Sequence, residues 1–319
     1  MRLRTLLVPV LLAGAPAHAQ TVYPVKSVRI IVPSAPGGGT DITTRALNQR
    51  LIEFLGQPFV VENRGGAATM IGTEIAARGA PDGYNLLMAS SALSVNPAMV
   101  KKMAYDAVRD FAPVSLVNSS PNVLTTHPSL PALSVREFIT LAKARPGQIT
   151  YASSGVGSSL HLTMEYFMAE SGIRMNHIPY KGAGPANIDV IAGHAVAMMG
   201  SMISVAQFVR DRRMRALGVT SLKRSQILPA VPTIAESGVP GYESIQWYGL
   251  LAPAGTPRDI VAKLNEVVVR AVREPAIRKR FAEDGVDPVG STPEAFATVI
   301  RDDIAKWHRV VKQAGIKPE

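Results

Sequence analysis

Short runs of β-branched and apolar residues alternate along this chain with longer segments of helical periodicity. The first run, residues 27–33 (SVRIIVP), predicts a buried strand, and after a glycine loop apolar residues recur at helical spacing until Gly56. Further strands are predicted at residues 59–63 and 84–90. Strands that alternate with helices in this way predict an α/β fold with a parallel sheet.

The same alternation starts again after an extended segment at residues 115–128, and a last strand is predicted at residues 247–253 before two long amphipathic helices. This order predicts two α/β lobes with a ligand cleft between them. Two hinge crossings, near residues 118–124 and 244–250, would let the cleft close. We expect the lobes to comprise residues 20–120 with 248–319, and residues 121–247.

The N-terminus has the pattern of a cleavable export signal. Arg2 and Arg4 precede a short apolar stretch, and Ala17 and Ala19 fit a cleavage site before Gln20. The apolar stretch is too short to span a bilayer, and no later segment approaches the required length of about 20 residues. We therefore expect residues 1–19 to be a signal peptide and the mature protein to be periplasmic. The alternative is a cytosolic protein with a disordered N-terminus.

Composition narrows the possible functions. The chain has no cysteine, which excludes disulfides, thiolate metal sites and a cysteine nucleophile. The net charge is +10, but the densest basic cluster, residues 210–215, contains an aspartate and no aromatic residue. Non-specific phosphate binding needs an ordered stripe of cations. We therefore expect no nucleic-acid partner, although the positive field could attract small anions.

Four loops share one design, with glycine and hydroxyl residues between a predicted strand and a predicted helix. They are residues 34–41 (SAPGGGTD), 63–69 (NRGGAAT), 153–159 (SSGVGSS) and 180–186 (YKGAGPA). Ligands of open α/β sheets bind at this edge, where N–H groups at helix N-termini favour an anion. The loops therefore predict a site for an anionic group, most simply a carboxylate.

Enzymatic alternatives find little support in the motifs. No glycine loop ends as a P-loop does, and G-x-S-x-G, S-x-x-K and H-E-x-x-H patterns are absent from the sequence. His161 and Glu165 have the i, i+4 spacing of metal ligands, but a hydrogen bond between them is the stronger interpretation without a third ligand. Asp41 could be a general base, but helix capping explains it better. We predict no catalytic residue, no metal and no cofactor.

Several stretches together resemble the Bug-type, TctC-like substrate-binding proteins of tripartite tricarboxylate transporters. The resemblance covers essentially all of the mature chain. The matching stretches are YPVKSVRIIVPSAPGGGTD, LGQPFVVENRGGAATMIG, PDGYNLL, LAKARPGQITYASSGVGSSLHL, IPYKGAGPANIDVIAG, VPTIAESGVPGY, WYGLLAPAGTP and VKQAGIKPE.

The resemblance implies a two-lobed periplasmic receptor of the type II binding-protein fold. Such a receptor closes on a small carboxylic acid and delivers it to integral membrane subunits, and we expect it to act as a monomer. Family loops of both lobes grip the carboxylate through backbone N–H groups and hydroxyls. Carried onto this sequence, these positions are Ser34, Ala35, Gly37, Gly38, Gly39, Thr40, Asp41, Ser153, Ser154, Gly155, Gly157, Ser158, His161, Tyr180, Lys181 and Gly182.

Three departures from the family pattern bear on the ligand. Ser34 stands where the family usually has an aromatic residue, and ENRGGAATM replaces ENRPGAGG in the second loop. Val196 replaces the usual acidic residue, and the strand ends in Met198 and Met199. Because methionine adapts to irregular shapes, these changes suggest a methionine-lined pocket for a bulkier or more aromatic acid.

Two other functions stay open at this point. An exported hydrolase on the same fold would use Ser154 or Ser158 with His161. A ligand sensor would pass its closed state to a signalling partner, and nothing in the sequence separates it from a transport receptor.

Overall fold

The computed structural model describes residues 23–318, and the predicted signal peptide lies outside the described residues. The strands are β1 (Val28–Val32), β2 (Phe59–Asn63), β3 (Asn85–Ser90), β4 (Phe111–Thr126), β5 (Thr150–Ser153), β6 (Asn176–Pro179), β7 (Ala197–Ser201), β8 (Arg215–Val219), β9 (Ile245–Pro253) and β10 (Asp287–Pro288). The helices are α1 (Gly39–Leu55), η1 (Ala67–Thr69), α2 (Met70–Ala77), α3 (Ala92–Met99), α4 (Val135–Ala144), α5 (Ser159–Ser171), α6 (Ala183–Ala192), α7 (Met202–Arg210), α8 (Arg258–Arg273), α9 (Pro275–Glu283) and α10 (Pro293–Gln313). None of these described helices combines the length and apolar composition needed to cross a bilayer.

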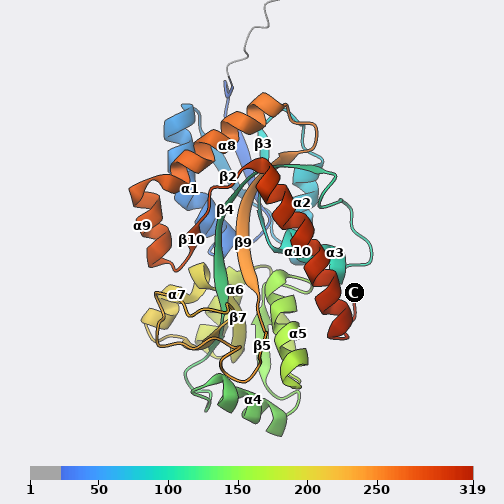
Figure 1. The fold of residues 1–319 in the computed structure, drawn as a ribbon, viewed down its shortest axis with the longest axis vertical. Coiled ribbons are helices and arrows are strands. Elements are labelled where there is room, and N and C mark those ends of the chain that lie inside the picture. The colour runs from blue at the N-terminus through green and yellow to red at the C-terminus, as the bar shows by residue number, and fades with distance from the viewer. Residues whose placement is uncertain (1–22, 319) are drawn as a thin grey trace, which may run out of the picture.

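The long strand β4 belongs to both lobes (Figure 1). Its residues 111–121 pair with β9, and its residues 122–126 pair with β7 and β8. The strand order is β2-β1-β3-β9-β4-β7-β5-β6, with β8 and β10 also paired to β4. We call the part built on β1, β2, β3 and β9 the first lobe, and the part built on β5, β6, β7 and β8 the second lobe.

The sheets are mixed, whereas the sequence pattern predicted parallel sheets. β1 is parallel to β2 and β3, and β5 is parallel to β6 and β7. β9 is antiparallel to both of its neighbours, β3 and β4. The difference arises because β4 and β9 carry the chain between the lobes. Their direction follows from that path and not from a helical crossover.

The chain changes sheets at two adjacent points. Pro121 is the last residue of β4 paired with β9, and Asn122 is the first paired with β7. On the return path, Ser244 N donates to Thr220 O at 3.0 Å in the second lobe, and Ile245 then pairs with Pro121. Both points fall inside the segments predicted as hinge crossings.

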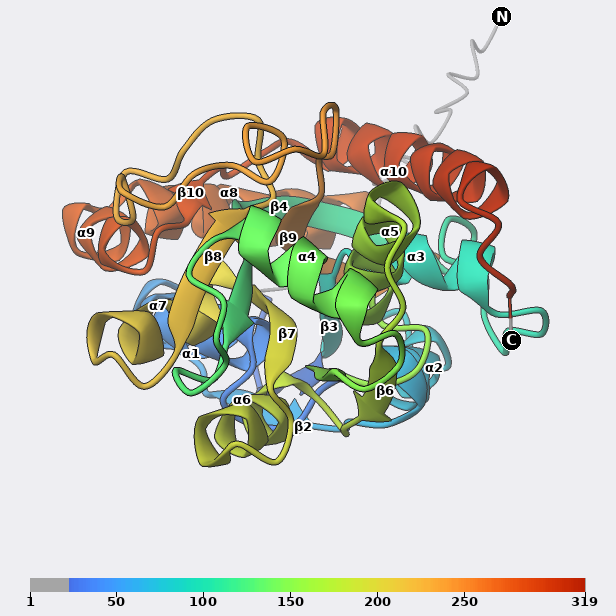
Figure 2. The ribbon, with the colours of Figure 1, turned by 90° about the horizontal axis from the view of Figure 1, so that it is seen from below.

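Helices cover both faces of each sheet. In the first lobe, α1 and α8 pack on one face and α2, α3 and α10 on the other. In the second lobe, α4 and α5 cover one face, and α6 and α7 the other (Figure 2). The two layers of helices bury the apolar faces and leave the strand ends, where the loops lie, free for a site.

An apolar cluster also joins the lobes beside the cleft. The C-terminal helix α10 packs along α3, and its Trp307, Val310 and Val311 belong to one apolar cluster with Leu162 of α5 in the second lobe. Tyr166 of α5 stands edge-on to the Trp307 ring, with the ring centroids 6.5 Å apart. Figure 1 shows α10 descending from the first lobe towards α5.

Candidate functional site

A narrow cavity lies between the lobes, with an empty volume of about 460 Å³. Glycines, hydroxyl residues and one amide dominate its wall. The lining residues are Pro33, Ser34, Gly38, Gly39, Thr40, Gly66, Thr69, Ser90, Ala92, Ser154, Ser159, Leu160, Lys181, Gly182, Ala183, Ser201, Gln246 and Tyr248. Among these described lining residues Lys181 alone carries a charge, and its side chain belongs to an exposed residue.

Five helices from both lobes begin at this cavity. The first turns of α1, α3, α5, α6 and α7 all contribute to its wall. The N-caps of α1, α6 and α7 have no side-chain capping bond, so their first backbone N–H groups are free to bind a ligand. Helix N-termini carry partial positive charge, and their convergence from both sides favours an anion.

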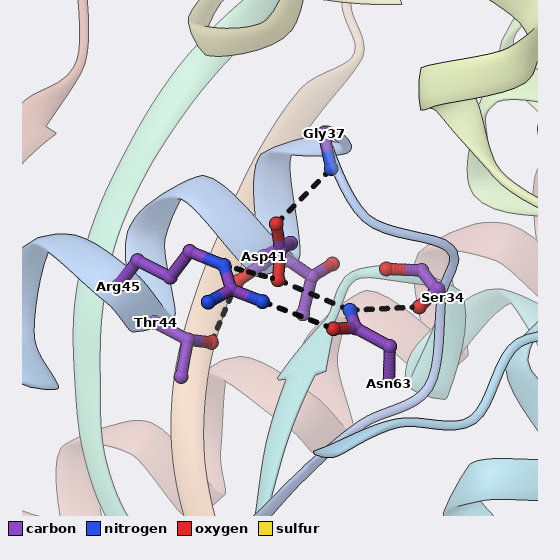
Figure 3. A network of polar contacts seen from close by, with 7 residues as sticks. Ser34, Gly37, Asp41, Thr44, Arg45 and Asn63 are labelled. Carbon is purple, nitrogen blue, oxygen red and sulfur yellow. Dashed lines mark hydrogen bonds and ion pairs between the residues drawn. The ribbon is translucent and has the colours of Figure 1, made fainter. Parts of the chain in front are cut away.

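A polar network fixes the first glycine loop (Figure 3). One carboxylate oxygen of Asp41 accepts the N–H of Gly37 at 3.0 Å, and the other accepts bonds from Arg45 at 2.9 Å and Asn63 at 3.0 Å. Asn63 also donates to the backbone oxygen of Ser34 at 3.1 Å. The loop is therefore held from behind by a side chain that the sequence identified as a helix-start residue.

Asp41 stays ionised in this network. Burial would raise the pKa of its carboxyl, but the hydrogen bonds from Arg45, Gly37 and Asn63 outweigh burial and lower the pKa. Because Arg45 lies beside it, the negative charge of Asp41 is compensated locally. The charge of Asp41 therefore does not stop the cavity wall, which consists mainly of neutral hydrogen-bond donors, from binding an anion.

The glycine-serine loop of the second lobe is held by its own side chains. Ser158 accepts the N–H of His161 at 3.2 Å and so caps α5. Nδ1 of His161 accepts the N–H of Gly157 at 3.1 Å, which places the ring proton on Nε2, towards Glu165 at 3.5 Å. Ser153 contacts both the N–H and the oxygen of Gly155 at 3.1 Å.

Three stacked rings support this loop. His177 lies between Tyr151 and His161, with centroid distances of 4.8 and 4.1 Å. Nε2 of His177 lies 2.6 Å from the Ser153 hydroxyl, and Tyr151 donates to Glu165 at 2.6 Å. Burial and the neighbouring His161 lower the pKa of His177 from 6.5 to about 4, against an opposing effect of Glu165. His177 is therefore a neutral spacer at physiological pH.

The depressed pKa of His177 predicts a defined pH dependence of stability. Between pH 6.5 and about 4 the unfolded chain binds a proton at this residue that the folded chain does not, so stability falls as the pH is lowered through this window. His177→Gln should flatten the dependence. Thermal melts of both proteins across the window test this, and parallel curves for parent and variant would contradict it.

The loops of the two lobes touch each other at the cavity rim. Ala35 N donates to Lys181 O at 3.3 Å, which is a hydrogen bond across the cleft. A methyl group on Gly184 would lie 2.2 Å from the backbone oxygen of Pro36. Tyr180, the residue before Lys181, is turned away and contacts Asp189 at 2.5 Å. The described conformation is a closed one.

The predicted site residues divide into two groups. Those in the cavity wall are Ser34, Gly38, Gly39, Thr40, Ser154, Lys181 and Gly182. Those in the supporting layer or the rim are Ala35, Gly37, Asp41, Ser153, Gly155, Gly157, Ser158, His161 and Tyr180. The hydroxyl oxygen of Ser34 is buried and has no hydrogen-bond partner within the described chain, as expected of a group that awaits a ligand.

Several wall residues were not predicted from the sequence. Ser90 ends β3 in the same strand-to-helix position as the glycine loops, a signal that could have found it. Gln246 and Tyr248 come from β9, where no local signal exists. Burial raises the pKa of Tyr248 to about 12, although its contacts with Ser201 and Gln246 oppose this. Its hydroxyl therefore stays protonated and can donate.

The structure does not give the pocket the methionine lining that the sequence suggested. Met198 and Met199 are 0% exposed, and they pack into the two separate cores of the second lobe. Successive residues of a strand face opposite sides, so both side chains point into helix layers and away from the strand end. Only Ser201, at the end of β7, reaches the cavity.

The second loop is strained where this chain departs from the family pattern. Ala67, Ala68 and Thr69 have φ values of 44°, 51° and 78°. This left-handed region suits glycine, and a β-branched residue such as Thr69 is rare there. Asn96 of α3 donates to the oxygen of Ala68 at 3.1 Å and so helps to hold the loop. Thr69, in this left-handed conformation, is one of the residues that line the cavity.

Comparisons with known proteins agree with this architecture. Residues 43–316 match the family described as tripartite tricarboxylate transporter family receptor. Protein BugT of Bordetella pertussis is 40% identical over 306 residues, which cover 95% of this chain and 94% of BugT. An R. palustris protein solved with adipate has a TM-score of 0.90 at 34% identity, over 93% of this chain and 100% of that one. MatC from Rhodopseudomonas palustris with bound malate has a TM-score of 0.86 at 30% identity, over 91% of this chain and 100% of MatC.

Proposed function

We propose that this chain, which belongs to the family of tripartite tricarboxylate transporter receptors, binds a small carboxylic acid between its lobes and hands it to integral membrane subunits. The family assignment confirms the resemblance found in the sequence. The observation that carries the proposal is the cavity itself, where free helix N-termini of both lobes surround one narrow space with neutral donors. Such a site favours a carboxylate without a buried cation.

The site fits a receptor for a carboxylate better than it fits a hydrolase. Ser158 contacts the backbone of His161 and not its ring, and Nδ1 of that ring accepts a backbone N–H. A serine nucleophile needs its hydroxyl within hydrogen-bond reach of a free base nitrogen. The close pair Ser153 and His177 lies behind the loop, where Ser153 is 0% exposed. We infer binding without turnover.

Closure would follow from ligand contacts with both lobes. Hinge points at residues 121–122 and 244–245 would allow the second lobe to move against the first. A ligand that touches both lobes only in the closed form would shift the population to that form. The same closed surface would then be presented to the membrane subunits, by a monomer in the periplasm. A receptor that signals would use the same change, and co-purification with membrane subunits distinguishes the two roles.

A thermal-shift screen tests the proposed ligand class. A carboxylic acid at about 100 times its dissociation constant should add about 2.7 kcal/mol to stability. For a chain of this size the expected rise in melting temperature is several degrees. Matched amides and esters of the same acids serve as controls and should give no shift. Shifts with nucleotides alone, or with no acid in a broad panel, would contradict the proposal.

A further inference from the structure

Thr69 combines two properties that rarely occur together. Its backbone is left-handed, with φ 78° and ψ −9°, and its side chain is branched at Cβ. A branched residue is an outlier in this region of backbone conformation, whereas glycine meets no steric penalty there. Glycine at position 69 would form the same turn without strain. The turn alone therefore does not explain the threonine.

The surrounding structure holds the strained conformation in place. Ala67 and Ala68, the two residues before Thr69, are left-handed as well. The Ala68 oxygen accepts a side-chain N–H of Asn96 at 3.1 Å, and the Thr69 oxygen accepts the hydroxyl of Thr73 at 2.9 Å. Backbone strain persists only where the surroundings enforce it, and it is concentrated at ligand sites and active sites. The strain at Thr69 therefore calls for a function of its side chain.

Thr69 lies where a molecule bound in the cleft would be in reach. Of the three left-handed residues of this loop, Thr69 alone is among the described residues that line the cavity. The loop lies against the first glycine loop, because a methyl group on Gly65 would be 3.2 Å from the carbonyl carbon of Ser34. Ser34 lines the same cavity, and its buried hydroxyl oxygen has no partner within residues 23–318. Two adjoining loops thus bring hydroxyl residues to one cavity.

The Thr69 hydroxyl is able to donate a hydrogen bond. Nδ2 of Asn96 lies 3.5 Å from Oγ1 of Thr69, and since an amide nitrogen can only donate, the hydroxyl is the acceptor in this long contact. The same Nδ2 also donates to the Ala68 oxygen and to the Tyr105 hydroxyl, at 3.1 Å each. The contact leaves the hydroxyl proton of Thr69 unused. A carboxylate oxygen, which only accepts, complements that proton.

We propose that Thr69 is a ligand-binding residue of the cleft, whose hydroxyl donates to a carboxylate oxygen of the bound acid. This inference rests on the proposed function and adds a contact that the backbone N–H groups of the glycine loops do not supply. Those groups are present whatever the side chains are, whereas this donor depends on one residue. The strained turn is the consequence of a hydroxyl residue at a position that suits glycine. Stability and binding therefore make opposite demands on position 69.

Titration calorimetry with a panel of straight-chain monocarboxylates and dicarboxylates tests the proposed hydrogen bond. Thr69→Val keeps the branched shape and removes the hydroxyl. Each acid that binds the parent should bind this variant about 10- to 100-fold more weakly, as expected for a lost hydrogen bond to a charged group. Thr69→Ser keeps the hydroxyl and should restore most of the parent affinity. Unchanged affinity of Thr69→Val, or an equal loss in Thr69→Ser, would overturn the role of Thr69 and leave the carboxylate receptor intact. If no acid of the panel binds the parent, the proposed function fails and this inference fails with it.

Thr69→Gly separates the backbone strain from the ligand contact. The melting temperature should rise, by up to about 4 °C, because the relieved strain exceeds the effect of the added flexibility of the unfolded chain. The affinity for the same acids should nonetheless fall as far as in Thr69→Val. A residue that only shapes the loop would not change stability and affinity in opposite directions. A Thr69→Gly protein that binds these acids as tightly as the parent would overturn the proposal.

Ala67→Gly is the matched control in the same loop. Ala67 is left-handed, with φ 44°, but it is exposed and is not among the described residues that line the cavity. The substitution should also raise the melting temperature, and it should leave the affinity for every acid of the panel unchanged. If Ala67→Gly loses as much affinity as Thr69→Gly, binding depends on the rigidity of the loop, and the direct contact is excluded.

Discussion

Gly184→Ala is expected to fold as well as the parent chain and to bind its carboxylate about 10- to 100-fold more weakly. Gly184 is the second residue of α6, and an added methyl group would lie 2.2 Å from the Pro36 oxygen of the other lobe. The obstacle is backbone, which cannot rotate away, and overpacking of this kind costs about 1–3 kcal/mol. In an open conformation the lobes separate and the clash disappears. The cost therefore falls on closure and not on folding.

Two measurements separate these effects. The melting temperature of the ligand-free variant should match or slightly exceed that of the parent, because alanine is favoured over glycine in a helix. Titration with the ligand found by the screen should show the loss of affinity, and small-angle scattering should show no compaction at a ligand concentration that closes the parent. Ile188→Ala, on the exposed face of α6, is the control and should bind normally. Unchanged affinity of Gly184→Ala would mean that the described closed contact is not part of the ligand-bound state.

Gly39→Ala should lower the stability of the free protein as well as its affinity. A methyl group at Gly39 would lie 1.9 Å from the Tyr248 hydroxyl oxygen and 2.8 Å from Cγ2 of Ile203. Tyr248 belongs to the same lobe, so opening does not relieve its clash. Forcing this buried ring aside should cost about 1–3 kcal/mol, or several degrees in melting temperature. Because Tyr248 lines the cavity, binding should fall with it.

A rescue and a neighbouring substitution make this prediction specific. Tyr248→Phe removes the oxygen nearest the new methyl group, so adding it to Gly39→Ala should restore part of the lost stability in a double-mutant cycle. Gly38→Ala is the control, because its methyl group would meet only ordinary contacts at 3.7 Å and its φ of −82° suits alanine. It should melt like the parent. Equal melting temperatures for all these proteins would exclude a steric role for Gly39.

The parts of the site that the sequence predicted are those with a local signature. A strand, a glycine loop and a helix start are contiguous in sequence, and parallel strands bring all such loops to one edge. For this reason the sequence alone predicts that Ser34, Gly39, Ser154 and Gly182 lie near one site, and all four line the cavity. The polar network that holds the first glycine loop was predicted only in part, as a helix-start role for Asp41. Its partner Asn63 is the last residue of β2, 22 residues further along the chain.

The missed parts depend on pairing between distant segments. Tyr248 enters the cavity because β9 inserts between β3 and β4, and no pattern inside β9 reports that position. Helix α3 went unpredicted because it is short and contains Pro97. The methionine hypothesis failed for a related reason. The face on which Met198 lies is set by the register of β7 against β4 and β5, which the local run does not encode.

The central place of β9 also dictates an order of assembly. β3 and the first part of β4 share β9 as their common neighbour, yet β9 is the last long strand to be synthesised, after the whole second lobe. Pairings of such large sequence separation are slow to form. A nascent chain that ends before Ile245 therefore lacks the strand that closes its first sheet. The two edges of that gap stay open, and this lobe can acquire its native sheet only when the final quarter of the chain has begun to emerge.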